Sequence, residues 1–404
     1  MLKKLREIGP GALTAAAFIG PGTVTTATIA GAQYGYALVW TLIFATFAAM
    51  TLQETAARLG VVGRTGLGEA IVKAASQSKA VKWAAIALIV VALFIGNAAY
   101  EGGNIAGAAL GVKAALPDAP HSVVVGAIAL FAGGLLFFGG YDVIERVLIG
   151  AVIVMAGAFG ASLMVIGPDW AGLASGIAPS VPAGALPIAI GLIGTTIVPY
   201  NLFLHAAAAR RKWSNAEGLS AARIDAGLSI GIGGIISILV LATAAASFFG
   251  SAQNIASAAD LAIQLEPAFG AGAVWLMAAG LFAAGLSSAV TAPLATGFAA
   301  AELFGFESNP RNNKFRLVAA AVLIVGATVA ITGARPVEII LLAQFANGLL
   351  LPVVAIFLLL AANRKALLKE KTNGALANMA GGAVVLIALG LGLRAILRAL
   401  GVID

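Results

Sequence analysis

A helix-breaking triplet lies in the middle of an apolar segment near the N-terminus. The triplet is Gly20-Pro21-Gly22, and the hydroxyl residue Thr23 follows it directly. Proline lacks a backbone N–H and glycine loosens the chain, so an α-helix is interrupted here. Because lipid cannot satisfy the carbonyl groups that such a break frees, the break is expected to face a cavity or the protein interior.

A second break of the same kind lies in TTIVPYN, residues 195–201, where proline is preceded by Thr195, Thr196 and Val198 and followed by Tyr200. A single proline would be read as an ordinary kink, which membrane helices tolerate. Interrupted segments at matching places in two halves of a chain instead indicate a transporter with its substrate site near the bilayer midplane. We therefore predict that the two breaks form a substrate site.

Five further polar residues lie within apolar segments, and each has two readings. Glu101 is the carboxylate placed deepest in such a segment; it either carries a proton or forms a buried structural hydrogen bond beside Asn104. His205 is a proton relay or a hydrogen-bonded structural residue. Gln344 and Asn347 either line a pathway or join neighbouring helices. All five are predicted to belong to a proton pathway or a polar lining.

The composition is that of a polytopic membrane protein. Of 404 residues, 61% are hydrophobic and 10% are charged, whereas soluble proteins carry about 25% charged residues. Apolar runs long enough to cross a bilayer predict eleven spans. They lie near residues 11–33, 37–57, 83–110, 122–140, 146–166, 185–209, 226–249, 271–301, 317–333, 337–362 and 376–399.

The basic residues predict the orientation of these spans. With a cytoplasmic N-terminus, twenty of the 24 Lys and Arg residues fall on the cytoplasmic side, as the positive-inside rule requires. The net charge of +7 is then explained by topology, so nucleic acid is not expected as a partner. We predict a multi-pass protein of a bacterial-type inner (plasma) membrane.

The longest predicted external connection, near residues 167–187, divides the chain into two groups of five spans. Because five is odd, the second group must be inverted relative to the first. We therefore expect one transporter domain over the whole chain. It contains a first repeat at 1–166, a second, inverted repeat at 185–362, and an added helix at 376–399.

Other functional classes fit the sequence less well. The chain has two histidines and no cysteine, which excludes disulfides, and it shows no cluster with the spacing of a catalytic or metal site. An open channel does not need two matched breaks, and a receptor or structural role leaves them unexplained. We expect a non-enzymatic transporter without a cofactor or an obligate protein partner, whose partners are a small inorganic ion and membrane lipid.

Three segments resemble the Nramp (natural resistance-associated macrophage protein) family of proton-coupled divalent-metal transporters. GPGALTAAAFIGPGTVTTATIAGAQYGYALVW is similar to the family pattern of GPG, then DPGN, then AGAQ-(F/Y)-GY. GTTIVPYNLFLHAA resembles G-A-T-(V/I)-M-P-H-N-L-(Y/F)-L-H-S, and AAGLSSAVTAPLATGF resembles S-G-Q-S-S-T-(I/V)-T-G-T-L-A-G-Q. The resemblance implies an all-α LeuT-type fold with a 5+5 inverted repeat and broken first and sixth helices.

The chain departs from this family at the positions that matter for metal binding. In the family, the Asp and Asn of DPGN and the Met of the sixth span supply metal ligands. Here Gly20, Thr23 and Val198 stand at those positions. Thr195 stands where the family has an alanine whose carbonyl is a ligand, and Tyr200 stands in place of a histidine. We therefore assign no residue as a metal ligand from the sequence.

The eighth span offers a candidate site for a coupling ion. Ala284, Ser287 and Ser288 have the spacing i, i+3, i+4, which places them on one helix face. In sodium-coupled members of the LeuT-type fold, a carbonyl and two hydroxyls at this spacing hold sodium together with carbonyls of the first-span break, here Phe18 or Gly20. Serine also commonly mediates helix packing in membranes, so both readings stay open.

These departures lead to an expectation about the substrate. A site without a carboxylate or a thioether is poor for manganese or iron. A helix starting near Thr23 presents backbone N–H groups and the positive end of its dipole, which suit an anion. We therefore expect alternating-access transport of a small anion, with bicarbonate first and small carboxylates next, with sodium coupling as one option. The alternative is a divalent-metal transporter for hydrated magnesium, or for manganese or iron, with weakened proton coupling because Asn104 replaces an acidic residue of the family.

Overall fold

A computed structural model describes residues 19–75, 78–138, 141–251, 253–332 and 335–402, and the side chains of all of these except 141–148. Phe18 and the first part of the first predicted span therefore lie outside the described residues. Helices make up most of the described chain, and no strand is found in it.

The helices follow the order of the predicted apolar runs. They are α3 (Pro21–Tyr34), α4 (Val39–Val61), α5 (Leu67–Ala74), α6 (Lys79–Ala115), α7 (His121–Phe138), α8 (Tyr141–Ile166), α9 (Trp170–Ser175), α10 (Leu186–Thr196), α11 (Pro199–Lys212), α12 (Leu219–Phe248), α13 (Ala258–Ala262), α14 (Glu266–Phe269), α15 (Ala273–Phe304), α16 (Asn313–Ile331), α17 (Pro336–Ala362), α18 (Lys365–Leu368) and α19 (Ala375–Ala399).

Within the described ranges, nine helical segments are long and apolar enough to cross a membrane. This confirms the all-helical membrane class. The predicted total of eleven spans, the cytoplasmic N-terminus and the division into two repeats stay predictions.

The second break lies where the sequence predicts it. Helix α10 ends at Thr196 and α11 begins at Pro199. The two residues between them leave the helical conformation, with φ/ψ of −112°/77° at Ile197 and −76°/121° at Val198. Helix α3 likewise begins at Pro21, after Gly20 in an extended conformation.

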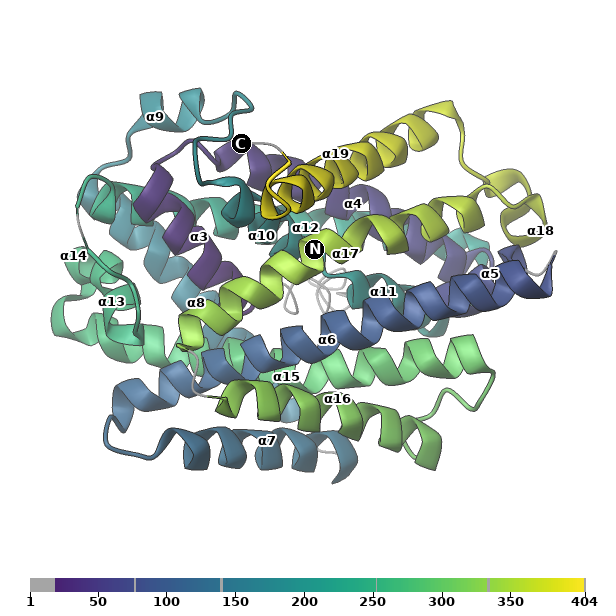
Figure 1. Ribbon diagram of the computed structural model, residues 1–404, viewed down its shortest axis with the longest axis horizontal. Helices are drawn as coiled ribbons and strands as arrows, with labels where there is room; N and C mark the ends of the chain where they lie inside the picture. Colours follow the sequence, from purple (N-terminus) through teal and green to yellow (C-terminus); the bar gives the residue numbers. More distant parts are fainter. Residues whose placement is uncertain (1–18, 76–77, 139–140, 252, 333–334, 403–404) are drawn as a thin grey trace.

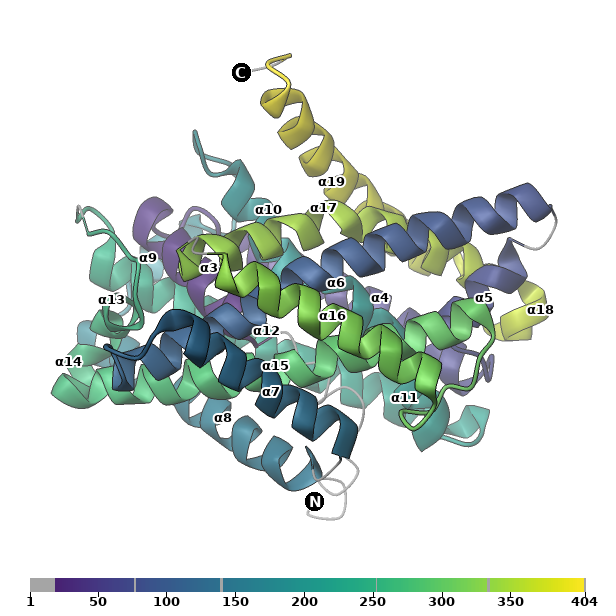
Figure 2. The same cartoon turned by 60° about the horizontal axis from the view of Figure 1, so that its bottom comes forward.

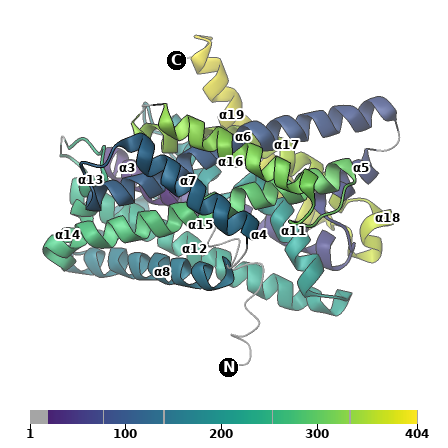
Figure 3. The ribbon, with the colours of Figure 1, turned by 90° about the horizontal axis from the view of Figure 1, so that it is seen from below.

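The long helices α6 and α15 pack side by side, and α16 and α7 lie beside them in the same layer. Helix α17 also packs against α6, and it contacts α10 and α3. Figure 1 shows α10 and α11 near the centre of the molecule, so the chain break between them is surrounded by other helices. Helix α19 packs on α17 but projects from the rest of the molecule towards its C-terminal end (Figures 2 and 3).

Helices α10 and α17 approach each other closely because glycines face each other across the contact. A Cβ on Gly194 of α10 would overlap the backbone of Gln344 and Gly348 in α17. A Cβ on Gly348 would in turn overlap the backbone of Ile190. The register of these two helices, which fixes the second break relative to α17, therefore depends on residues without side chains.

We expect Gly194→Ala to destabilise the protein by about 1–3 kcal/mol, because the added methyl group forces two backbones apart. Gly126→Ala in α7 is the matched control, since no atom lies within 4 Å of its new Cβ, and a helical Gly→Ala change stabilises by about 0.5–1 kcal/mol. The thermal unfolding midpoints of the two purified variants measure the difference. Equal midpoints would show that the α10–α17 contact is not tight.

Candidate functional site

The two breaks meet in the interior of the protein. Thr23, in the first turn of α3, and Thr195, in the last turn of α10, have their Oγ1 atoms 2.8 Å apart. Both residues are fully buried. The structure thus brings together two positions 172 residues apart, one from each of the two breaks.

The α10 side of the break presents oxygen atoms. The carbonyl of Thr195 would bond the amide of residue 199 in a continued helix, but residue 199 is proline and has no N–H. The last carbonyls of a helix also carry the negative end of its dipole. The Thr196 hydroxyl is engaged within its own helix, where it donates to the Leu192 carbonyl at 2.9 Å.

The start of α3 offers few N–H donors. Pro21 has none, and the N–H groups of Thr23 and Val24 both donate to the Gly20 carbonyl, at 3.1 and 3.3 Å. At most the N–H groups of Gly20 and Gly22 are left for a ligand. The sequence predicted several free N–H groups at this helix start. That prediction is wrong, because the turn at Gly20 satisfies two of them.

Gln344 of α17 lies against the first break. It is 1% exposed, and a Cβ on Gly22 would overlap its side-chain amide. Among the described residues, its Oε1 atom has no hydrogen-bond partner. Gly22 is thus needed for close approach, and the side-chain amide of Gln344 lies against the first break.

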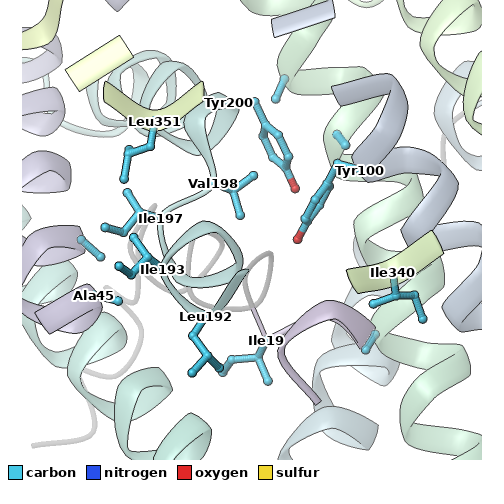
Figure 4. Packing of buried hydrophobic residues seen from close by; sticks show 14 of the residues in the cluster. Ile19, Ala45, Tyr100, Leu192, Ile193, Ile197, Val198, Tyr200, Ile340 and Leu351 are labelled. Atoms are coloured by element: carbon cyan, nitrogen blue, oxygen red, sulfur yellow. The ribbon is translucent and has the colours of Figure 1, made fainter. Parts of the chain in front are cut away.

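Two tyrosines pack beside the second break. The rings of Tyr100 in α6 and Tyr200 in α11 meet edge to face, with centroids 5.5 Å apart. Figure 4 shows Val198 projecting towards the same region as these rings. The sequence analysis missed Tyr100; its position directly before Glu101 was the one signal available.

Glu101 points to a different face of α6. Its side chain packs against Gly326 of α16, while its Oε2 accepts a hydrogen bond of 3.3 Å from Asn104. Successive helical residues are rotated by about 100°, which explains why Tyr100 faces α11 and Glu101 does not. The Glu101 side chain therefore lies on the α16 side of α6, while Gly107 of the same helix lies against Pro21 of the first break.

The other predicted residues that the structure describes are also buried. His205 lies in α11 and Asn347 in α17, and both are fully buried. Ala284, Ser287 and Ser288 are buried in α15, and the Ser287 carbonyl accepts a hydrogen bond of 2.8 Å from Thr291.

Phe18, the fourth member of the expected sodium site, is outside the described residues, so that site stays a prediction. Within the described part of the chain, no three His, Asp or Glu side chains come together as a metal cluster.

A cavity of about 660 Å³ lies on the side of the molecule away from most of the basic loops. Its lining includes Ile29 and Gln33 of α3, Ile188 of α10 and Leu341 of α17. Leu341 lies one helical turn from Gln344. The cavity is therefore lined by the same three helices that carry Thr23, Thr195 and Gln344.

At the opposite, basic end, the short helix α5 bridges two of the long helices. The Gly68 N–H donates to Glu302 Oε2 of α15 at 2.9 Å, and Arg210 of α11 pairs with Glu69 at 3.0 Å. Helix α5 thus ties the second half of the broken helix to α15 on the side that the positive-inside rule assigns to the cytoplasm.

Comparison with known families gives one match over nearly the whole chain. Residues 11–398 match the family described as natural resistance-associated macrophage protein-like. Among curated proteins, the divalent metal cation transporter MntH of Acidiphilium cryptum is 32% identical over 98% of this chain and 90% of its own length. MntH of Pectobacterium carotovorum is 33% identical over 72% of this chain and 71% of its own.

Solved structures support the fold. The Eremococcus coleocola manganese transporter, in complex with an aromatic bis-isothiourea compound, has a TM-score of 0.77 and 23% identity, covering 96% of this chain and 85% of that one. MhsT in complex with L-phenylalanine has a TM-score of 0.61 and 15% identity, covering 96% and 98%. At these identities the likeness concerns the fold alone, and it confirms the LeuT-type fold.

The expectation of an anion carrier for bicarbonate is wrong. Both curated relatives are named as divalent metal cation transporters, and the family match over residues 11–398 includes both breaks. The physical reason for the error lies at the start of α3, where the Gly20 carbonyl already accepts the N–H groups that an anion would need.

The remaining broad expectations agree with the family. Its members are membrane transporters, not enzymes, that carry an ion and need no cofactor. The apolar helices and the bacterial relatives also agree with a multi-pass protein of a bacterial inner membrane. With a family match from residue 11 to residue 398 and a full-length relative at 32% identity, the chain belongs to the Nramp family.

Proposed function

We propose that this protein is a secondary active transporter of a divalent metal cation, which it takes up with much of its water shell. Hydrated magnesium is the favoured cargo, ahead of manganese and iron. The observation that carries this proposal is the meeting of the two breaks at a buried pair of threonine hydroxyls, Thr23 and Thr195, 2.8 Å apart.

The oxygen atoms around the Thr23–Thr195 pair suit a hard cation as ligands. The hydroxyls of Thr23 and Thr195, the Thr195 carbonyl and the Gln344 amide carbonyl are all neutral oxygen donors. Mg²⁺ binds oxygen and keeps several waters, so few direct protein ligands suffice. Softer metals favour nitrogen and sulfur ligands, and Val198 supplies neither. The negative end of the α10 dipole favours a cation where no carboxylate is present.

The surroundings of the site fit alternating access. We propose that the cavity lined by α3, α10 and α17 is the outer approach to the site, while α5 ties α11 to α15 at the inner end. We propose that residues 1–166 and 185–362 are inverted repeats that exchange these two arrangements, with 376–399 as an added helix. We assign substrate binding to the predicted residues of both breaks. They are Gly20, Pro21, Gly22, Thr23, Thr195, Thr196, Val198 and Tyr200.

Proton coupling is proposed to be weak. Glu101 is bonded to Asn104 and packs against Gly326 of α16. Asn104 stands where the family resemblance implies a second acidic residue, so this part of α6 has one carboxyl group instead of two. His205 is buried in α11 and is retained as a candidate for the same polar pathway.

Proteoliposomes containing the protein should take up Mg²⁺ with saturation. Thr195→Val should lower uptake about tenfold, because it removes one oxygen donor worth about 1–1.5 kcal/mol. Thr51→Val is a matched control: its hydroxyl bonds the Phe47 carbonyl within α4 and should leave uptake unchanged. Absence of saturable uptake of Mg²⁺, Mn²⁺ and Fe²⁺ alike would overturn the proposed function.

Gly20→Asp should shift the preference towards Mn²⁺ and tighten its binding tenfold or more, about 1.4 kcal/mol. A carboxylate here restores the charge that the family resemblance implies, and a higher ligand charge raises cation affinity. The backbone accepts the change, because Gly20 is extended at φ −93° and ψ −177° and Asp is a favoured residue before a helix.

Competition between Mn²⁺ and Mg²⁺ during uptake measures this shift in preference. Gly20→Asn is the control, because it has the same shape without the charge and should leave the ratio of the two ions near that of the wild type. A Gly20→Asp variant with an unchanged ratio would show that residue 20 does not face the cation.

A further inference from the structure

Two buried asparagines lack hydrogen-bond partners for both of their side-chain polar atoms. Asn201 in α11 is 1% exposed and Asn347 in α17 is 0% exposed. Among the described residues, neither the Oδ1 nor the Nδ2 atom of either residue has a partner. A buried amide without partners loses its hydration without compensation, so native proteins retain few such groups.

Both asparagines lie one helical turn beyond the site, on its inner side. Asn201 follows Val198 of the second break by three residues, and Asn347 follows Gln344 by three. The helices continue from there towards the basic end of the molecule. The two amides therefore lie between the site and the basic end of the molecule, where α5 packs.

Helices α11 and α17, which carry the two asparagines, contact each other, and both contact α6. The Oδ1 atom of Asn347 lies 3.6 Å from where a Cβ on Gly96 would be. Tyr200, the neighbour of Asn201, packs on Tyr100. Gly96 and Tyr100 are four residues apart and so lie on the same face of α6, about 6 Å apart along its axis.

Another buried amide in the same region is satisfied. Asn97 of α6 is 1% exposed, and its Nδ2 donates to Thr296 Oγ1 of α15 at 2.5 Å. Packing around α6 can thus supply a partner to a buried asparagine. Asn201 and Asn347 are distinguished by the lack of one, which points to a role in another conformation.

We propose that Asn201 and Asn347 form an inner hydration site, which binds the water shell of the divalent cation on its way to the cytoplasmic side. When α11 separates from its neighbours, water and the hydrated cation supply the partners that both amides lack in the present conformation. This inference rests on the proposed function, since it requires a cation that keeps its water.

Asn201→Leu and Asn347→Leu test the site, because leucine has a similar size without polar atoms. Each should lower Mg²⁺ uptake at least tenfold while leaving the thermal unfolding midpoint unchanged or higher. Asn97→Leu is the matched control and should lower the midpoint, because its partner Thr296 loses a hydrogen bond. Unchanged uptake in both test variants, or midpoints that fall as in the control, would overturn the inference.

Serine at the same positions should restore part of the uptake, since Asn201→Ser and Asn347→Ser keep an oxygen. A purely structural role predicts no such rescue.

Asn347→Cys gives a second, independent measurement, because the chain contains no other cysteine. A small water-soluble thiol reagent should modify this cysteine from the cytoplasmic side during turnover with Mg²⁺ and more slowly without it. A thiol that stays unmodified while the variant transports would refute the inner hydration site.

The two proposals fail in different ways. If the wild type moves no divalent cation, the proposed function falls and the Mg²⁺-dependent labelling must be absent. If the wild type transports Mg²⁺ but the leucine variants do so equally well, only the inner hydration site falls.

Discussion

The structure depends on the meeting of two helix breaks inside a protein that is otherwise apolar. Each break frees backbone groups that lipid cannot satisfy, so the two must be enclosed by other helices. The pair formed by Thr23 and Thr195 fixes α3 against α10, and the glycines between α10 and α17 fix both against Gln344. The polar centre can therefore exist only because small residues allow three helices to approach it closely.

Charge is the constraint that separates this site from a carboxylate-based metal site. Taking a bare divalent ion out of water in an apolar interior is very costly, and Gly20 and Val198 provide neither charge nor a soft ligand. Hydroxyl and carbonyl oxygens can replace only part of a hydration shell. The residues therefore favour the proposed cargo, an ion that keeps its inner waters, over an ion that must lose them.

The sequence predicted the membrane class and the places where helices break, because these depend on local composition and on proline and glycine. The LeuT-type fold was implied by the resemblance of three segments to the Nramp family. The sequence did not predict which residues of each helix face which neighbouring helix. Glu101 and Tyr100 are neighbours in sequence, yet one packs against α16 and the other against α11. The error about the anion had the same origin: whether the N–H groups at the start of α3 are free depends on the turn at Gly20. Asn201 is, like Asn347, a polar residue within a predicted span, but the lack of partners that distinguishes it exists only in the packed structure.

A transporter must be stable in more than one conformation, so some groups are poorly satisfied in each. The inner end shows the satisfied kind: Glu302 accepts the Gly68 N–H, and Glu69 pairs with Arg210. Opening this end breaks those interactions and must be offset elsewhere. Buried amides such as Asn201 and Asn347 gain hydrogen bonds when water reaches them. Their desolvation raises the free energy of the closed arrangement, which brings it nearer to that of the open one. Unpaired polar groups along the closed half of the route thus lower the difference in free energy that alternating access has to cross.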